Sequence, residues 1–163
     1  MRKLLPLLAL LSVAAEPTPA QRGHKALTET AFIPAFWTAR AAGLAYKQWG
    51  VAEPPADYWT VFRDRYGLHD APYPNAGLPM GLRKAKHVFG QGLGADCMLC
   101  HGGSVMGTSY VGLGNSTLDI HALFEELARA DGINRKLPFT FSNARGTNEA
   151  GAFGVYQIGR AHI

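Results

Sequence analysis

Apolar residues recur at helical spacing most clearly over residues 116–130. The stripe on this stretch consists of Ile120, Leu123, Phe124 and Leu127. Such spacing is typical of a helix that buries one face. Ser116 and Asp119 have the spacing of a capping box, and the Asp131-Gly132 pair supplies a stop. The pattern therefore predicts a helix over residues 116–130.

Two further helices are predicted upstream, before a stretch rich in proline. Residues 36–48 carry a single apolar stripe, and residues 55–66 begin at two prolines and also carry an apolar face. Residues 67–80 contain three prolines, which predicts a loop. Residues 83–89 form a short basic stretch, and the glycine-rich residues 90–96 predict a flexible loop. The apolar residues 150–158 fit a helix or a strand, so the best-marked elements are helical.

The first fifteen residues have the parts of a secretory signal peptide. Arg2 and Lys3 precede an apolar run of about ten residues, and small residues allow cleavage after Ala15 or Ala20. The run is short for a spanning helix, which needs about twenty residues, and a retained anchor is the alternative. We therefore expect export to the periplasm or another extracytoplasmic space. A polar leader over residues 16–25 and no stable membrane span after signal removal are also expected.

Charge and common catalytic motifs exclude several classes of function. The formal charge is +4 at pH 7, and loss of Arg2 and Lys3 lowers it by two, to +2. That value is too small to favour nucleic acid or a membrane surface as a partner. The sequence also contains no G-x-S-x-G, H-E-x-x-H or Walker motif.

The two cysteines of the chain stand three residues apart, and a histidine follows the second. Cys97-Met98-Leu99-Cys100-His101 is a C-x-x-C-H string, the pattern of covalent haem attachment. On one helical turn, thiols at this spacing share a side and can both add to the vinyl groups along one porphyrin edge. His101 then places an imidazole under the iron. Asp96 is suited to cap the turn, and Gly102 and Gly103 allow the backbone to leave it beside a porphyrin.

Three other readings of the cysteine pair explain less. A small disulfide leaves His101 without a role and closes only a tiny loop. A thioredoxin-like site needs a strand leading into the motif within a βαβ unit. A zinc site needs two further Cys or His ligands at a recognisable spacing, which the sequence does not supply.

The segment from Cys97 to Gly103 resembles the haem-binding segment of the cytochrome c family. The resemblance implies one haem c, held by thioether bonds from Cys97 and Cys100, with His101 as the proximal iron ligand. It also implies a mostly α fold: a cytochrome c-like helical haem domain over residues 91–163, preceded by a helical N-terminal extension over residues 26–90. Residues 77–82 and 145–148 are similar to segments of larger exported multi-haem oxidoreductases. This second similarity and the apolar end of the sequence suggest that the haem domain is truncated.

The sequence leaves the distal iron ligand open. Small electron carriers of the family place a methionine some tens of residues after the motif, whereas the only methionine downstream here is Met106. The other candidates are Met80, His87, His121 and His162, and an open sixth position is a further alternative. His24 and His69 read as ordinary leader and loop residues. Arg83, Lys86 and Arg145 are candidates to neutralise haem propionates, although solvated surface charge is the favoured reading of each.

Two functions follow from these expectations. The first is a c-type cytochrome that transfers electrons to and from redox partner proteins outside the cytoplasm. The alternative is the haem part of a larger di-haem oxidoreductase of peroxidase or oxygenase type. A ligand-binding haem sensor is a third reading. A six-coordinate iron with two protein ligands only shuttles electrons, whereas a five-coordinate iron can bind peroxide or dioxygen.

Overall fold

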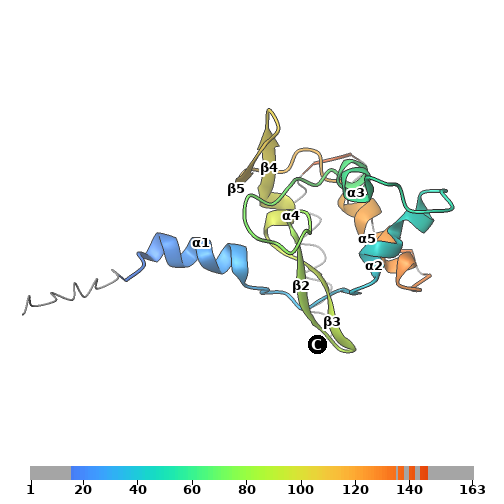
Figure 1. Cartoon of the computed structure of the whole chain (residues 1–163), viewed down its shortest axis with the longest axis horizontal. Helices are drawn as coiled ribbons and strands as arrows, with labels where there is room; N and C mark the ends of the chain where they lie inside the picture. Colours follow the sequence, from blue (N-terminus) through green and yellow to red (C-terminus); the bar gives the residue numbers. More distant parts are fainter. Residues whose placement is uncertain (1–15, 135, 138–139, 142–143, 147–163) are drawn as a thin grey trace, which may run out of the picture.

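The computed structural model describes residues 16–134, 136, 137, 140, 141 and 144–146 (Figure 1). The helical elements are α1 (Pro19–Glu29), α2 (Ala41–Leu44), the 3-10 turn η1 (Ala45–Gln48), α3 (Tyr58–Tyr66), α4 (Met98–His101) and α5 (Ile120–Ala130). The strands are β1 (Trp37–Thr38), β2 (Leu82–His87), β3 (Gly90–Ala95), β4 (Gly102–Val105) and β5 (Thr108–Val111). The predicted signal peptide, residues 150–158 and His162 lie outside the described residues.

The prediction of a mostly α, cytochrome c-like helical domain is wrong. Of the described residues, 34% are helical and 17% lie in strands, and the strands form two antiparallel sheets. The motif forms a short helical turn between strands of these two sheets and is not part of a helical bundle. The fold is therefore mixed α and β, and both residues 26–90 and residues 91–163 contribute strands to it.

The glycine-rich stretch before the motif is strand β3, not a flexible loop. It is the middle strand of a three-stranded sheet with the order β1-β3-β2. A Cβ on Gly92 would lie 2.5 Å from the Trp37 carbonyl oxygen, and one on Gly94 would lie 3.2 Å from Cβ of Ala85. The glycines are required because neighbouring segments approach this strand closely.

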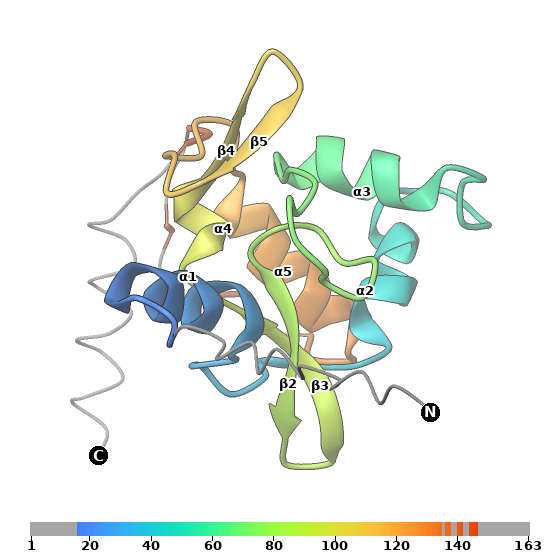
Figure 2. The same cartoon turned by 60° about the vertical axis from the view of Figure 1, so that its left-hand side comes forward.

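Two hairpins extend from opposite ends of the molecule. The β2–β3 hairpin pairs in the register Leu82 with Ala95 and His87 with Gly90. The β4–β5 hairpin begins directly after the motif and pairs Gly102 with Val111. Figures 1 and 2 show the β2–β3 turn at one end and the β4–β5 turn at the other. The motif itself lies between the two hairpins along the chain.

Two of the three predicted helices exist but begin later than predicted, and the third is divided into shorter elements. The helix predicted over residues 36–48 is replaced by β1, α2 and η1, and the helix predicted over residues 55–66 begins at Tyr58. The helix predicted over residues 116–130 begins at Ile120, and its cap is Asp119, whose side chain accepts a hydrogen bond from the Ala122 amide at 3.0 Å. Its end at Asp131 is confirmed. The predicted leader over residues 16–25 is mostly helix α1, which Thr18 and Gln21 begin with a capping box.

The core lies where α5 packs against α2, η1 and α3 and against the three-stranded sheet. Its buried side chains include Trp37, Ala41, Ala45, Phe62, Leu82, Leu93, Leu118, Leu123 and Leu127. Among the described residues no helix is long and apolar enough to cross a membrane.

A buried carboxylate joins α3 to α5. Both oxygens of Glu126 accept hydrogen bonds from the Arg65 guanidinium, at 2.7 and 2.6 Å, and one also accepts from the Tyr66 hydroxyl at 2.8 Å. The Trp49 indole donates to the Tyr66 oxygen at 3.1 Å. Because the charge is paired and its lone pairs are used, burial of Glu126 is tolerated.

Two buried phenols make the fold sensitive to alkaline pH. Burial raises the pKa of Tyr58 to about 12 and also raises the pKa of Tyr66. In the unfolded chain a tyrosine ionises near pH 10. We therefore expect the free energy of unfolding to lose these contributions as the pH rises from about 10 to about 12, because the unfolded chain releases the protons first. Urea unfolding followed by circular dichroism across this range measures the effect.

Substitution of Tyr58 by phenylalanine isolates the contribution of this one hydroxyl to the alkaline loss of stability. Tyr58→Phe is expected to flatten the alkaline decline and to cost about 1 kcal/mol at neutral pH, because its hydroxyl donates to the Ala42 carbonyl. Tyr110 is half exposed on β5, so Tyr110→Phe serves as the control and should leave the decline unchanged. An equally steep decline in Tyr58→Phe would contradict this assignment.

Candidate functional site

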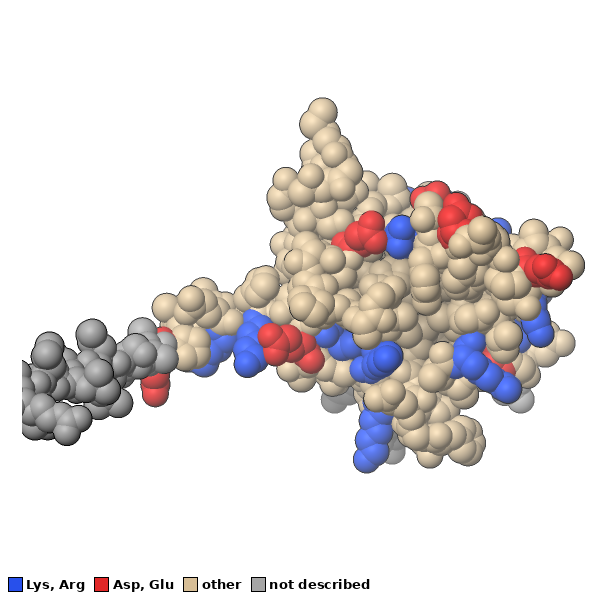
Figure 3. All heavy atoms as spheres, viewed as in Figure 1, with Lys and Arg blue, Asp and Glu red and all other residues tan. Residues whose placement is uncertain are grey.

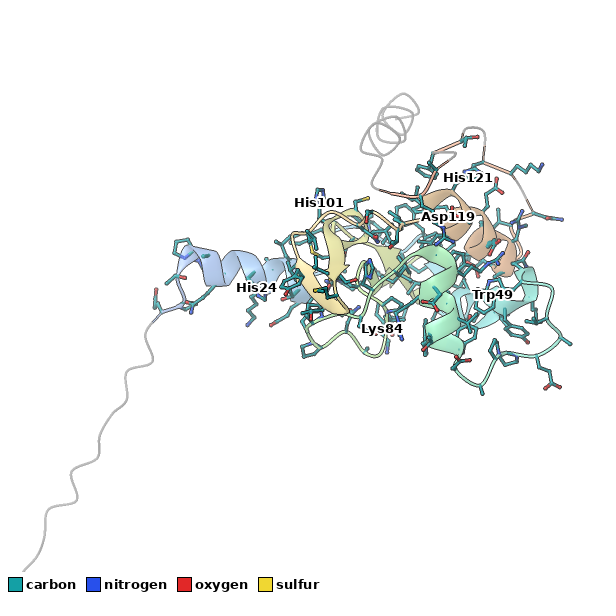
Figure 4. All side chains as sticks on the ribbon, turned by 90° about the horizontal axis from the view of Figure 1, so that it is seen from above. His24, Trp49, Lys84, His101, Asp119 and His121 are labelled. Carbon is teal, nitrogen blue, oxygen red and sulfur yellow. The ribbon has the colours of Figure 1, made fainter. Side chains whose placement is uncertain are left out.

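The C-x-x-C-H motif forms a single helical turn. Cys97 precedes α4, and Cys100 and His101 end it, so the three donors stand at positions i, i+3 and i+4. Cys97 and His101 are exposed and Cys100 is half-buried, whereas Met98 and Leu99 are buried. Figure 4 shows His101 at the edge of the molecule, well away from His121 on α5. The turn therefore directs Cys97 and His101 outward and Met98 and Leu99 into the core, while Cys100 packs partly buried against that core.

Asp96 fixes the beginning of this turn. One carboxylate oxygen accepts a hydrogen bond from the Met98 amide at 2.8 Å, which confirms the predicted cap. The other oxygen accepts from Nε of Arg83 at 2.8 Å. The Asp96 amide donates to the Gly81 carbonyl at 2.9 Å. The turn is thus anchored to β2 at its first residue.

Arg83 is buried, and its guanidinium links three parts of the fold by hydrogen bonds. Its guanidinium donates to the carbonyls of Thr28 and Leu27 at 2.6 and 2.9 Å, in addition to Asp96. The side chain is buried, so both sequence readings of Arg83, propionate partner and solvated charge, are wrong. Arg83 instead joins α1, β2 and the motif.

Loss of the Asp96 carboxylate is expected to be costly. Asp96→Ala removes the cap of α4 and leaves the buried Arg83 charge without its counter-ion, which should lower the free energy of unfolding by about 3 kcal/mol. Asp119→Ala removes only the cap of α5 and should cost about 1 kcal/mol. Chemical denaturation of both variants makes the comparison, and equal losses would show that the buried ion pair adds nothing.

Asn115 holds the other side of the turn. It is only 1% exposed, and its amide side chain donates to the Gly67 carbonyl at 2.9 Å and to the Leu99 carbonyl at 3.3 Å. Its backbone amide donates to the Cys100 carbonyl at 2.8 Å. The end of α4 is therefore joined to the loop that follows α3.

His69 extends this network to the β4–β5 hairpin. Its ring nitrogens lie 3.0 Å from the Ser104 hydroxyl and 3.2 Å from the Asn115 side-chain oxygen. The reading of His69 as an ordinary loop residue missed this role. The sequence gives no sign of it, because the partners are 35 and 46 residues away.

The two glycines after His101 serve packing within the chain. A Cβ on Gly102 would lie 2.4 Å from the Met98 carbonyl oxygen and 2.8 Å from Cγ of Met80. A Cβ on Gly103 would lie 2.6 Å from the Gly114 carbonyl oxygen. The close neighbours that require glycine here are the protein's own atoms.

The described candidates for the distal ligand are placed in different parts of the fold. Met80 is buried against Gly102, on the inner side of the turn. His121 lies 3.5 Å from the Glu125 carboxylate and its ring contacts Phe141. His87 accepts a hydrogen bond from the Phe89 amide at the β2–β3 turn. Met106 is fully exposed at the tip of the β4–β5 hairpin, in a left-handed conformation with φ of 49°.

The other basic candidates have structural or surface positions. Arg145 donates to the carbonyls of Asp64 and Arg65 at 3.1 and 2.6 Å, and so satisfies carbonyls near the end of α3. Lys86 is exposed on β2, as its reading as solvated charge requires.

The residues of the turn fit a covalently held haem. Neither cysteine forms a disulfide, and the spacing of the two sulfur atoms and the His101 imidazole places them along one side of the turn, with Cys100 the more buried of the two cysteines. On the adjoining hairpin, Val105 and Tyr110 are half exposed. Apolar groups of this kind are suited to cover one face of a porphyrin. A set of zinc ligands is not present in the described part of the chain, which contains no cluster of three His, Cys, Asp or Glu side chains suited to a metal. The described strands pair only antiparallel, so they do not form the βαβ unit of a thioredoxin-like site.

No family model matches the sequence, and no curated protein matches it either. The chemistry of the motif and its surroundings in the fold are therefore the grounds for a functional conclusion.

Proposed function

We propose that this protein carries one haem c, attached through thioether bonds from Cys97 and Cys100, with His101 as the proximal iron ligand. The observation that supports it most is that the three donors stand at positions i, i+3 and i+4 of one helical turn, with Cys97 and His101 exposed. The turn belongs to a mixed α and β fold, so the similarity to cytochromes c concerns this segment and not the domain around it.

Each donor has a definite chemical task. Each thiol adds across a vinyl double bond: sulfur bonds to one carbon and the thiol proton goes to the other, so no oxidant is needed. Nε2 of His101 would supply the lone pair that the iron needs as a ligand. Asp96 and Asn115 hold the two ends of the turn, and so keep the three donors in their relative positions.

The proposed activity is electron transfer outside the cytoplasm. A bound haem supplies a one-electron iron couple whose potential depends on its ligands and burial. The exposed side chains of Cys97 and His101 place the attachment edge at the surface, where a redox partner protein can approach it. Export rests on the signal-peptide pattern of residues 1–15.

A haem-dependent oxidoreductase of peroxidase or oxygenase type is the second candidate. It is favoured by the positions of Met80, His87 and His121, each of which is buried or engaged elsewhere, and which leave Met106 as the one fully exposed candidate among the described residues. A sixth position without a protein ligand is open to peroxide or dioxygen. In that case the described residues would be the haem part of a larger enzyme.

One preparation tests the proposal and separates the two candidates. The full chain is produced in a host that matures c-type cytochromes, and its intact mass and absorption spectrum are recorded with and without carbon monoxide. A mass increase of one haem supports attachment, and a colourless product with the mass of bare peptide contradicts it. Low-spin iron indifferent to carbon monoxide supports the electron carrier, whereas high-spin iron that binds it supports the oxidoreductase.

A further inference from the structure

The β2–β3 hairpin ends in exposed apolar side chains. Val88 and Phe89 form its turn, and each is 87% exposed. Phe32 and Ile33, in the segment between α1 and β1, are also exposed and line a shallow cavity together with Val88. We call these four residues the apolar tip. Scattered exposed apolar residues are ordinary, but a contiguous group at the end of a protruding element indicates a contact surface.

The apolar tip is held in place by backbone hydrogen bonds. The Ala35 amide donates to the Lys86 carbonyl at 3.0 Å, and the Phe36 amide donates to the Leu93 carbonyl at 3.1 Å. These bonds fix residues 35 and 36, which follow shortly after Phe32 and Ile33, against both strands of the hairpin. The surface is therefore preformed, and little ordering is needed for it to bind.

Basic side chains flank the apolar tip. Lys84 and Lys86 alternate with buried residues along β2 and are both exposed, and Lys86 and His87 line the cavity beside the tip. Figure 3 shows several Lys and Arg side chains along the lower half of the molecule, near this hairpin and on α1, whereas most Asp and Glu side chains of this face lie higher. Glu29, the acidic neighbour on this side, pairs with Lys25 at 3.8 Å. Although the net charge of the chain is small, basic side chains are concentrated at the end that carries the apolar tip.

We propose that the apolar tip and the two lysines dock the protein on the surface of an anionic phospholipid bilayer. Exposed valine, isoleucine and phenylalanine side chains at a hairpin end can enter the headgroup region, while lysines beside them contact anionic headgroups. Each lysine near such a surface strengthens binding about fivefold. No described helix can span a bilayer, so the association is peripheral.

The same charges argue against a symmetric pair of copies. A two-fold contact through the apolar tip would bring Lys84 and Lys86 of one copy towards those of the other, and like charges in one interface repel. A bilayer of anionic lipid offers the opposite charge over the whole surface.

Docking in this way orients the proposed haem site. The apolar tip and the β4–β5 hairpin lie at opposite ends in both views (Figures 1 and 2), and β4 begins immediately after His101. The attachment turn, which lies between the two hairpins (Figures 1 and 2), would therefore be held away from the lipid by the β2–β3 hairpin. The docking itself requires no haem, so the two proposals stand or fall separately.

The test uses vesicles of phosphatidylcholine alone and of phosphatidylcholine mixed with phosphatidylglycerol. Flotation of the purified exported protein should show binding to the mixed vesicles that weakens as salt is raised. V88S/F89S should reduce this binding at least tenfold, and K84Q/K86Q should reduce it by about thirtyfold at low salt. V105S/Y110S alters exposed apolar groups at the opposite end and serves as the matched control, which should bind normally. Cys97→Ala/Cys100→Ala should also bind normally, since docking is independent of haem.

Several outcomes would overturn the proposal. These are an absence of binding to the mixed vesicles, binding that V88S/F89S leaves unchanged, and equal loss in V105S/Y110S. Self-association that V88S/F89S abolishes, without any vesicle binding, would assign the surface to a second copy instead. Circular dichroism of each variant confirms that these surface changes leave the fold intact.

Discussion

Cys97→Ala/Cys100→Ala is expected to abolish covalent haem altogether, while each single variant retains one thioether bond. The two thiols are the only cysteines of the chain, so no other side chain can form the bond. The double variant should emerge from a maturation-competent host with the mass of the bare peptide. Pyridine haemochrome spectra should distinguish two thioether bonds in the wild type from one in each single variant.

His101→Ala provides the complementary measurement. It keeps both thiols but removes the imidazole that ends α4, so the spin state and ligand binding of any attached haem should change while its mass does not. The fold should survive in Cys97→Ala, because that side chain is exposed. A double cysteine variant that still carries covalent haem, or a His101→Ala protein with an unchanged spectrum, would contradict the assigned roles.

The local geometry of the motif could be predicted because its cause is local. The spacing of Cys97, Cys100 and His101 places them on one side whenever the segment is helical, and Asp96 caps the turn from the adjacent position. Neither inference depends on the remainder of the fold. The shape of the turn is accordingly predictable without knowledge of the domain that contains it.

The fold class could not be predicted in this way. Residues 90–95 contain three glycines, which have low strand propensity, yet the segment pairs with β1 on one side and β2 on the other, and neighbouring atoms leave little room for a side chain at Gly92 and Gly94. The burial of Arg83 likewise depends on carbonyls of α1 more than fifty residues away. Such requirements arise from packing partners that a local pattern does not reveal.

The N-terminal caps of α1 and α5 show that local sequence signals for a helix start can conflict. Thr18, Pro19 and Gln21 have the spacing of a capping box and do begin α1, so this signal was available and was missed. Ser116 and Asp119 have a similar spacing, but the true cap is Asp119. The residues before it are drawn into the Asn115 and Gly67 network, where the Thr117 hydroxyl donates to the Gly67 carbonyl at 3.0 Å. Tertiary hydrogen bonds decide between two locally acceptable starts.

Gly81→Ala is expected to be the most damaging single substitution near the motif. Gly81 has φ of +90°, and a Cβ there would lie 2.4 Å from Cα and 2.5 Å from the amide nitrogen of Leu99. Both atoms belong to the backbone of α4, so the clash is relieved only if the turn itself moves. The strained φ and the displaced turn together should lower the free energy of unfolding by about 4 kcal/mol or more.

Gly77→Ala separates the cost of the positive φ from the cost of the clash with α4. Gly77 has a similar φ of +77°, but nothing lies within 4 Å of the position its Cβ would take. It should therefore cost only the conformational penalty, about 1–2 kcal/mol. Denaturation curves of the two variants measure the difference, and the yield of covalent haem in a maturation-competent host tests whether the turn has moved. The Gly81 carbonyl also accepts a hydrogen bond from the Asp96 amide. A shift of Gly81 should therefore disturb the Asp96 cap and lower the yield of covalent haem, whereas Gly77→Ala should leave that yield unchanged. Equal stability and equal yield in the two variants would mean that the close approach of Gly81 to α4 does not position the three donors.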